Sequence, residues 1–279
     1  MEHILLENFS QEKCENFHKK FTSNEPFPHL VIDNFLNEES ANKILENFSI
    51  NKNWTNCSLV NNYKKYMLTN KNHMNAYCHK LLEELESEEF VKILSKITGM
   101  KNIFLDVNLE GGGLHQTFNG GSLNIHTDYY SHTVEKSWRR VINIIIFFNK
   151  DWLDKYNGEL EFWDANVKNK IQSVPPIFNR CVIFKTDKKS FHGHPKKLNL
   201  PPNISRKSIA AYYFAEEKEN LKLYPTKYFP RPNDTVFYIF LIHLDTFLKK
   251  IYSFLKRWGV LNDRFISKIL DLINFFKNK

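Results

Sequence analysis

Two histidines, one aspartate and one arginine are the residues whose types and order indicate metal chemistry. His126 and Asp128 are separated by one residue, and His192 and then Arg206 follow further along the chain. Two imidazoles and a carboxylate form the facial ligand set of non-haem Fe(II), which leaves three positions open for a co-substrate and O₂. An arginine can hold the carboxylate of such a co-substrate through two parallel hydrogen bonds. The four residues therefore predict an oxygenase that consumes a 2-oxo acid.

The spacing of His126 and Asp128 suits a β-strand, because residues i and i+2 face the same side of a strand. Both side chains could then reach one ion while Thr127 faces away. The third ligand must come from an adjacent strand, and the interval before His192 is long enough for several intervening strands. A histidine–x–aspartate pair alone is a weak signal, but the ordered set with a later histidine and arginine is specific.

The identity of the distal ligand stays open between two histidines. His192 follows an aromatic residue and precedes Gly193, whereas His194 lies two residues further on and would face the same way. His192 is favoured as the ligand, and His194 would then line the rim or bond a carboxylate. His115 and His132 are interpreted as structural histidines that bond to backbone or water.

The residues around Arg206 predict how a 2-oxo acid would be held. Arg206 would pair with the distal carboxylate of 2-oxoglutarate. Ser208 lies two residues further on, so its hydroxyl would face the same way and add a contact, while Lys207 would face the opposite side.

The composition is that of a globular protein. Of the 279 residues, 42% are hydrophobic and 15% aromatic, and many aromatic residues favour a sheet-rich core. The net charge of +8 comes from dispersed lysines, which we interpret as solvated surface and not as a nucleic-acid site. Four scattered cysteines indicate free thiols in a reducing compartment. With no signal peptide and no apolar run of about 18 residues, we expect a soluble, cytoplasmic protein without a transmembrane segment.

The chain divides into three predicted parts: an N-terminal helical support with an entry strand (1–100), a β-rich core (101–224) and a C-terminal helical hairpin (225–279). In the first part we expect a strand at 26–36, a helix that starts at the cap Asn37 and continues to about Phe48, a long loop at 51–72, and one helix from Asn72 to Gly99. Short strands follow, and they favour a sandwich or jelly roll. They are expected at 103–109, 141–148, 158–163, 181–184 and 208–214.

Two amphipathic helices are predicted in the C-terminal part, at 235–258 and 262–276. Their apolar faces would pack on the barrel or on a second copy of the chain, so a homodimer through these helices is expected. A membrane-surface role is the alternative reading of their basic edge.

These residues resemble the prolyl 4-hydroxylase-like family of 2-oxoglutarate/Fe(II) oxygenases, most closely from Phe104 to Phe214. Asn149–Trp152 followed by Gly158–Leu160 is similar to the segment that follows the buried strand in that family. The resemblance implies a mainly β (α+β) fold, a double-stranded β-helix with supporting helices. It also implies iron ligands His126, Asp128 and His192, 2-oxoglutarate at Arg206, and ascorbate as an additional cofactor.

Two departures from the family concern the co-substrate. Relatives often supply a tyrosine hydroxyl from the buried strand, but Ile146–Phe148 has none, so Asn143 is expected to line the pocket instead. A second frequent tyrosine precedes the metal pair, and Gln116 stands near that place. An aspartate at 128 also argues against halogenation, for which chloride would need that position.

The first functional hypothesis is therefore a hydroxylase of peptidyl proline that releases succinate and CO₂. The alternatives are a hydroxylase of a free amino acid, small metabolite or sugar, and a non-catalytic sensor of 2-oxoglutarate or O₂. Intact candidate ligands argue against the sensor, since a binding module has no need of all four residues.

Overall fold

Twelve strands form one curled antiparallel sheet in the part of the chain that the computed structural model describes, which is residues 5, 9–49, 51–58 and 61–258. The helices are α1 (Gln11–Ser23), α2 (Glu38–Leu45), α3 (Ala76–Glu86), α4 (Glu88–Thr98) and α5 (Val236–Arg257). The strands are β1 (His29–Ile32), β2 (Thr55–Asn56), β3 (Asn62–Leu68), β4 (Ile103–Leu105), β5 (Gly113–Thr127), β6 (Trp138–Phe147), β7 (Leu160–Trp163), β8 (Lys170–Val174), β9 (Arg180–Lys185), β10 (His192–His194), β11 (Arg206–Glu216) and β12 (Lys227–Tyr228).

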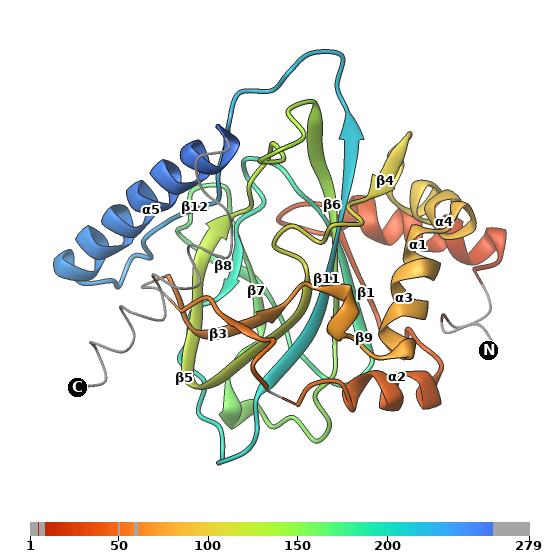
Figure 1. Cartoon of the computed structure of the whole chain (residues 1–279), viewed down its shortest axis with the longest axis horizontal. Coiled ribbons are helices and arrows are strands. Elements are labelled where there is room, and N and C mark those ends of the chain that lie inside the picture. The colour runs from red at the N-terminus through yellow and green to blue at the C-terminus, as the bar shows by residue number, and fades with distance from the viewer. Residues whose placement is uncertain (1–4, 6–8, 50, 59–60, 259–279) are drawn as a thin grey trace.

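The strands follow the order β1-β9-β6-β11-β5-β10-β7-β8, and β2, β3, β4 and β12 pair at the sides of this path. Non-consecutive neighbours and curling of the sheet give the predicted double-stranded β-helix (Figure 1). Helices α1 to α4 cover one side of the sheet, and α5 lies on the opposite side of the molecule (Figure 1). The mainly β fold with supporting helices is thereby confirmed.

Strand β5 belongs to both halves of the curled sheet. Its first part pairs with β11, where Thr117 lies opposite Arg206, and its last part pairs with β10, where His126 lies opposite His192. Gly121 lies between these parts, and a Cβ there would lie only 2.7 Å from the Phe118 carbonyl oxygen and 2.8 Å from that of Tyr63. The close approach of backbone at this point therefore requires glycine, and the two ends of β5 contribute residues to one interior.

Strand β6 is buried on both faces, which explains its continuous apolar run. Its residues Ile142, Ile144 and Ile146 belong to the core beneath the helices, whereas Phe147 belongs to the interior of the barrel. The interior core is completed by other large apolar side chains, which are Phe27, Leu160, Phe162, Val174, Val182 and Phe184. The helices thus stabilise the outer face of the sheet while the inner face is left to form a pocket.

Two predicted helix ends are confirmed by the capping geometry. The side chain of Asn37 accepts a hydrogen bond from the Ser40 amide at the start of α2. Gly99 ends α4 with a left-handed φ of 72°.

Two predictions for the first hundred residues are wrong. The expected loop at 51–72 contains β2 and β3, because pairing with β5 overrides the low strand propensity of its Asn and Lys residues. The expected single helix between Asn72 and Gly99 is two helices, α3 and α4, which are separated at Ser87. Ser87 is extended (φ −58°, ψ 144°) and caps α4 by accepting from the Phe90 amide.

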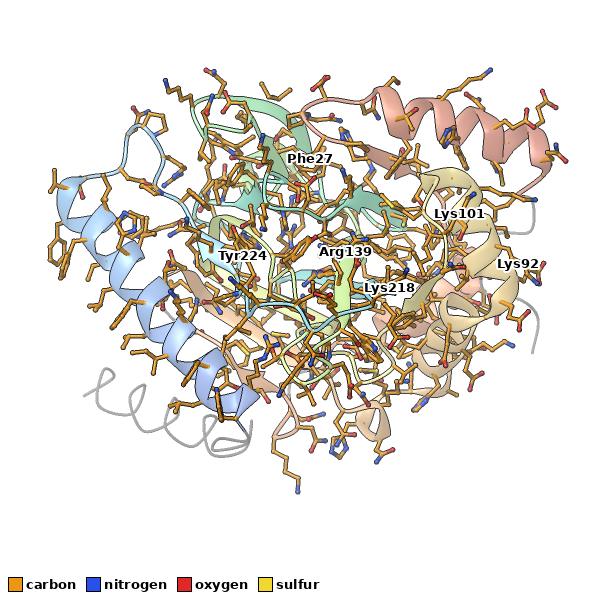
Figure 2. The ribbon with its side chains drawn as sticks, turned by 90° about the horizontal axis from the view of Figure 1, so that it is seen from above. Phe27, Lys92, Lys101, Arg139, Lys218 and Tyr224 are labelled. Carbon is orange, nitrogen blue, oxygen red and sulfur yellow. The ribbon has the colours of Figure 1, made fainter. Side chains whose placement is uncertain are left out.

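Basic side chains are spread over the surface. Lys92 and Lys101 lie beside the helical layer, whereas Arg139 and Lys218 lie over the strands (Figure 2). The three lysines are exposed, as the sequence predicts for a dispersed, solvated surface.

Helix α5 is the predicted 235–258 helix, and the Thr235 hydroxyl accepts a hydrogen bond from the Tyr238 amide at its start. The second C-terminal helix, predicted at 262–276, and therefore the hairpin lie outside the described residues. Among the helices that are described, none has the length and apolar character needed to cross a membrane.

A buried hydrogen bond connects the helices to the sheet and gives a stability prediction. The hydroxyl of Tyr213 on β11 donates to the carbonyl of Leu85 on α3 at 2.6 Å, and Tyr213 is fully buried. Tyr213→Phe should lower the free energy of unfolding by about 1–2 kcal/mol, because the buried carbonyl loses its donor. Urea denaturation measures this, with Tyr63→Phe as the control, since Tyr63 is 47% exposed. Equal stabilities of the two variants would contradict the prediction.

Candidate metal centre and co-substrate pocket

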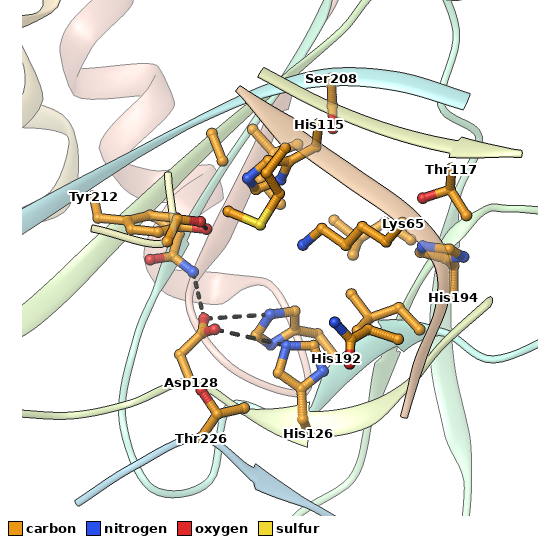
Figure 3. Close-up of a pocket in the computed structure, with 18 of the residues that line it drawn as sticks. Lys65, His115, Thr117, His126, Asp128, His192, His194, Ser208, Tyr212 and Thr226 are labelled. Atoms are coloured by element: carbon orange, nitrogen blue, oxygen red, sulfur yellow. Dashed lines mark hydrogen bonds and ion pairs between the residues drawn. The ribbon is translucent and has the colours of Figure 1, made fainter. Parts of the chain in front are cut away.

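Three buried side chains meet at one end of the barrel interior. His126 and His192 are register partners on β5 and β10, and Asp128 follows directly after β5. One potential ligand atom from each of the three residues lies within 4.8 Å of the others. The arrangement is shown in Figure 3, where both imidazoles face the carboxylate. Sequence spacing therefore predicted the right group of neighbours.

Backbone hydrogen bonds orient both imidazoles. The Nδ1 atom of His126 lies 2.8 Å from the Asn124 carbonyl, and Nδ1 of His192 lies 2.9 Å from the Ser190 carbonyl. A carbonyl can only accept, so Nδ1 carries the proton and Nε2 keeps its lone pair. These Nε2 atoms lie 3.6 Å and 3.3 Å from the Asp128 carboxylate oxygens. Both histidines thus have the tautomer that a metal ligand requires.

The charge states of the group also suit a cation. Burial lowers the pKa of His192 to about 4, so its imidazole is neutral near pH 7. Burial by itself would raise the pKa of Asp128, but Arg140, together with His192 and His126, lowers it well below its ordinary value. A neutral imidazole and an ionised carboxylate are the forms that bind metal.

The Asp128 carboxylate is held by two residues of β6. Asn143 Nδ2 donates to Asp128 Oδ2 at 2.6 Å, and Arg140 Nη2 lies 3.3 Å from the same oxygen. Arg140 Nε also donates to Asn143 Oδ1 at 2.6 Å, and the guanidinium stacks 3.3 Å from the Tyr212 ring centroid. Asn143 does line the pocket, as expected, but its amide is committed to Asp128 and Arg140.

Arg140 is a site residue that sequence reasoning missed. Strict alternation would place residues 140 and 143 on opposite faces of β6. The pairing register between β6 and β11 shifts near Val141, so that one extra residue stands on β6. This bulge turns Arg140 toward Asp128. A bulge of this kind depends on the partner strand and leaves no clear signal in the sequence.

Arg206 lies in the same pocket, at the start of β11. Its Nε donates to the Gly158 carbonyl at 2.7 Å, and its guanidinium lies 4.9 Å from the Phe147 ring centroid. Burial lowers the pKa of Arg206 to about 9, so it is still charged near pH 7. Gly158 has a φ of 87°, and a Cβ there would lie 2.5 Å from Leu198. Glycine therefore lets the backbone approach and orient the arginine.

Ser208 and Gln116 were also predicted to contact the co-substrate, and only Ser208 lies in the pocket. Ser208 lines the pocket two residues from Arg206, as expected. Gln116 does not line the pocket, and the prediction that it contacts the co-substrate is wrong. It stands between His115 and Thr117 on β5 and faces the other side of the strand, where it donates to the Phe48 carbonyl and accepts from Ser205. Alternation along β5 explains this result.

The position of His194 resolves part of the ambiguity about the distal histidine. His194 pairs with Leu123 and lines the pocket, yet it is outside the group of three potential ligands, which contains His192. Burial, with Arg206 and Lys65, lowers the pKa of His194 well below its ordinary value. His194 is therefore a neutral wall of the pocket.

Lys65 is the second site residue that sequence reasoning missed. It lies on β3 opposite Thr117, and its side chain extends into the pocket (Figure 3). Burial lowers the pKa of Lys65 to about 8. The 51–72 segment was expected to be a loop, so the alternation that points Lys65 inward could not be used.

The pocket has a volume of about 210 Å³ and joins the two ends of the site. Its metal end is formed by His126, Asp128 and His192, and its other end by Arg206, Ser208 and Thr117. A divalent ion at the first end and the carboxylate of a bound acid at the second would each meet groups of complementary charge.

Comparison with known proteins agrees with this geometry. Residues 112–214 match the model of the 2OG-Fe(II) oxygenase superfamily. This segment of the chain is similar in sequence to 2-oxoglutarate/Fe(II)-dependent oxygenases. The matched residues run from the turn before β5 through most of β11, and they include the three potential ligands and Arg206.

Solved structures of similar fold include two prolyl hydroxylases. One is the Trichoplax adhaerens prolyl hydroxylase in complex with a peptide fragment of the hypoxia inducible factor oxygen degradation domain. It has 16% identity and a TM-score of 0.53, over 73% of this chain and 91% of that one. The other is a Pseudomonas putida prolyl-4-hydroxylase, with 12% identity and a TM-score of 0.51, over 72% of this chain and 99% of that one. The resemblance to the prolyl 4-hydroxylase-like family is thus confirmed at the level of fold.

The site predicts how individual residues affect metal binding. His126→Ala should abolish binding of Mn(II), and Asn143→Ala should weaken it by roughly 10–100-fold, because the carboxylate loses its orienting donor. His194→Ala is the matched control and should change the affinity little. Isothermal titration calorimetry measures all three variants. A loss with His194→Ala as large as that with His126→Ala would contradict the assignment.

Proposed function

We propose that this protein is an Fe(II)/2-oxoglutarate-dependent hydroxylase, with His126, Asp128 and His192 as iron ligands and Arg206 as the co-substrate residue. The observation that carries the proposal is their position in one pocket, where two imidazoles face an ionised carboxylate and a buried guanidinium lies on a neighbouring strand. Iron bound there would supply the redox chemistry. In this chemistry O₂ oxidises 2-oxoglutarate to succinate and CO₂, and the reaction is coupled to hydroxylation of an unactivated C–H bond.

The chain's own residues bind and orient the reactants. Arg206 has its Nε committed to Gly158, so its two Nη groups remain for the distal carboxylate of 2-oxoglutarate. The Ser208 hydroxyl adds a contact from the same face of β11. Arg140 and Asn143 hold Asp128 in place, so the carboxylate does not need to reorganise when a metal binds. The apolar barrel interior excludes water from this end of the pocket.

The substrate proposed first is proline in a peptide or protein. The support is the fold shared with two prolyl hydroxylases, one of which is in complex with a peptide. Hydroxylation of a small molecule is the second candidate, and the specific observation that favours it is the charged lining of the pocket, in particular Lys65. Ascorbate is a proposed additive that would maintain the iron in its ferrous state.

Release of succinate tests the proposed function directly. Fe(II)-loaded protein with 2-oxoglutarate and ascorbate should form succinate when air is admitted, and proline-containing peptides should raise the rate. His126→Ala should form none. Succinate release that does not depend on peptides would support the oxygenase activity and would indicate a small-molecule substrate. Absence of succinate from protein that binds both iron and 2-oxoglutarate would contradict the proposal and favour a sensor.

Arg206→Ala should raise the KM for 2-oxoglutarate by about 100-fold, because a charge-assisted, bidentate contact is lost. Lys207→Ala is the matched control, since Lys207 is the neighbouring cation and its Nζ is directed to the Ser205 carbonyl. The ratio of the two KM values is the measurement. An unchanged KM in Arg206→Ala would exclude the role of this arginine.

We also propose that α5 mediates a homodimer. One stripe of this helix exposes large apolar side chains, among them Phe237 (71%), Phe240 (60%), Phe247 (59%) and Phe254 (52%). Such a stripe, about 30 Å long, is larger than the isolated apolar residues normal on a surface. Light scattering should give the mass of a dimer, and Phe240→Glu/Phe247→Glu should give a monomer, with Lys250→Glu as control. A monomeric wild-type protein would contradict the proposal.

A further inference from the structure

Lys65 is a second cation at the same level of the barrel as Arg206. Thr117 on β5 pairs with Lys65 of β3 on one side and with Arg206 of β11 on the other. All three side chains line the pocket, so Lys65 and Arg206 lie on either side of Thr117. In Figure 3 the Lys65 amine lies between His115 and the two histidines of the metal centre.

The described residues that line the pocket carry more positive than negative charge. The cations are Lys65, Arg140 and Arg206, and Asp128 is the carboxylate. Arg140 already pairs with Asp128. Among the described residues, none places a carboxylate within ion-pair distance of the Lys65 amine. A half-buried ammonium without a counter-ion is unfavourable, and an anionic ligand would offset that cost.

Arg206 alone can satisfy the distal carboxylate of 2-oxoglutarate. It is 7% exposed, and the contact with Gly158 fixes the direction of its fork, so two Nη groups suffice for both carboxylate oxygens. The other carboxylate of 2-oxoglutarate would go to the metal. The co-substrate therefore leaves Lys65 without an anion.

The position of Lys65 favours a ligand near the metal. Lys65 is half-buried, whereas Arg206 is buried. The Lys65 amine extends into the space between His115 and His192, which places it beside the metal centre in the more accessible part of the pocket (Figure 3). This is where a substrate must bring the bond that is to be oxidised.

We propose that the substrate carries a carboxylate and that Lys65 binds it. This inference rests on the proposed function, because it assumes that 2-oxoglutarate occupies Arg206 and the metal. The carboxylate can belong to a free amino acid or other small acid, or to an acidic position of a polypeptide. In either case Lys65 fixes the distance between the acid group and the carbon presented to the iron, which makes it a residue that determines specificity.

The experiment uses Mn(II)-loaded protein, which is bound to 2-oxoglutarate but does not turn over, and calorimetry as the readout. The probes are pairs that differ only in acid and amide: L-proline with L-prolinamide, N-acetyl-L-proline with its amide, and one proline-containing peptide with a free or an amidated C-terminus. The variants are Lys65→Met and Lys65→Arg. Lys64→Met is the matched control, because the Lys64 amine is exposed and bonds the Asn119 carbonyl.

In the wild-type protein and in Lys64→Met, at least one acid should bind about tenfold or more tightly than its amide. Lys65→Met should reduce this preference to less than about twofold, and Lys65→Arg should retain most of it. A preference among the small pairs assigns a small acid, and a preference in the peptide pair alone assigns the acidic end of a polypeptide. Both results support the proposal.

Three results would overturn the proposal while leaving the oxygenase intact. The first is that no acid binds better than its amide, and the second is that the preference persists in Lys65→Met. The third is that Lys65→Met weakens the binding of 2-oxoglutarate itself by about tenfold, which would assign Lys65 to the co-substrate. Failure of the wild-type Mn(II) protein to bind 2-oxoglutarate would instead refute the proposed function.

Discussion

The burial of the Asp128 carboxylate is the constraint on which the site depends. An ionised carboxylate that is 8% exposed must be surrounded by positive charge and donors, or it would take up a proton. Arg140 and Asn143 supply these on one side, and the Nε2 atoms of His126 and His192 face it on the other. A divalent cation would complete this arrangement, since its charge neutralises the Asp128 carboxylate and it accepts the Nε2 lone pairs of both histidines.

That constraint determines how the sheet must be built. The two histidines have to stand on neighbouring strands, and the supporting arginine has to come from a third strand on another part of the curled sheet. Strand β5 makes this possible because it pairs with β11 at one end and with β10 at the other. The same strand therefore connects the metal centre with the level of Arg206 and Lys65. The outer helices matter to function through the burial of the other face of the sheet, which keeps these strands in register.

Electrostatics divides the pocket into two regions of different character. At the metal end a carboxylate is balanced by Arg140, whereas Arg206 and Lys65 form no ion pair with a carboxylate of the described residues. A bound acid would therefore gain energy at both ends, through coordination at one and ion pairing at the other. The depressed pKa values of Lys65 and Arg206 have the same main cause, which is burial. The protein thus keeps the pocket in a state that favours anions.

Local sequence was sufficient for features whose signal lies in neighbouring residues. The pair His126 and Asp128, the cap at Asn37 and the stop at Gly99 depend on side-chain chemistry or backbone conformation within a few positions. The apolar run of β6 also identified a strand buried on both faces.

Features that depend on strand pairing could not be read in this way. Ser87 separates two helices that the periodicity joins, and Gln116 faces outward because the pleat of β5 places His115 and Thr117 inward.

Residue types and their spacing carried enough information to predict the proposed reaction class, the order of the candidate ligands and the β-rich fold. The support of Asp128 by Arg140 and the entry of Lys65 into the pocket became evident only from the folded chain. The first depends on a bulge against β11, and the second on a polar strand that exists only through its pairing with β5. Both are consequences of contacts between segments distant in the chain, and hydrogen-bond register between such segments has no local signature.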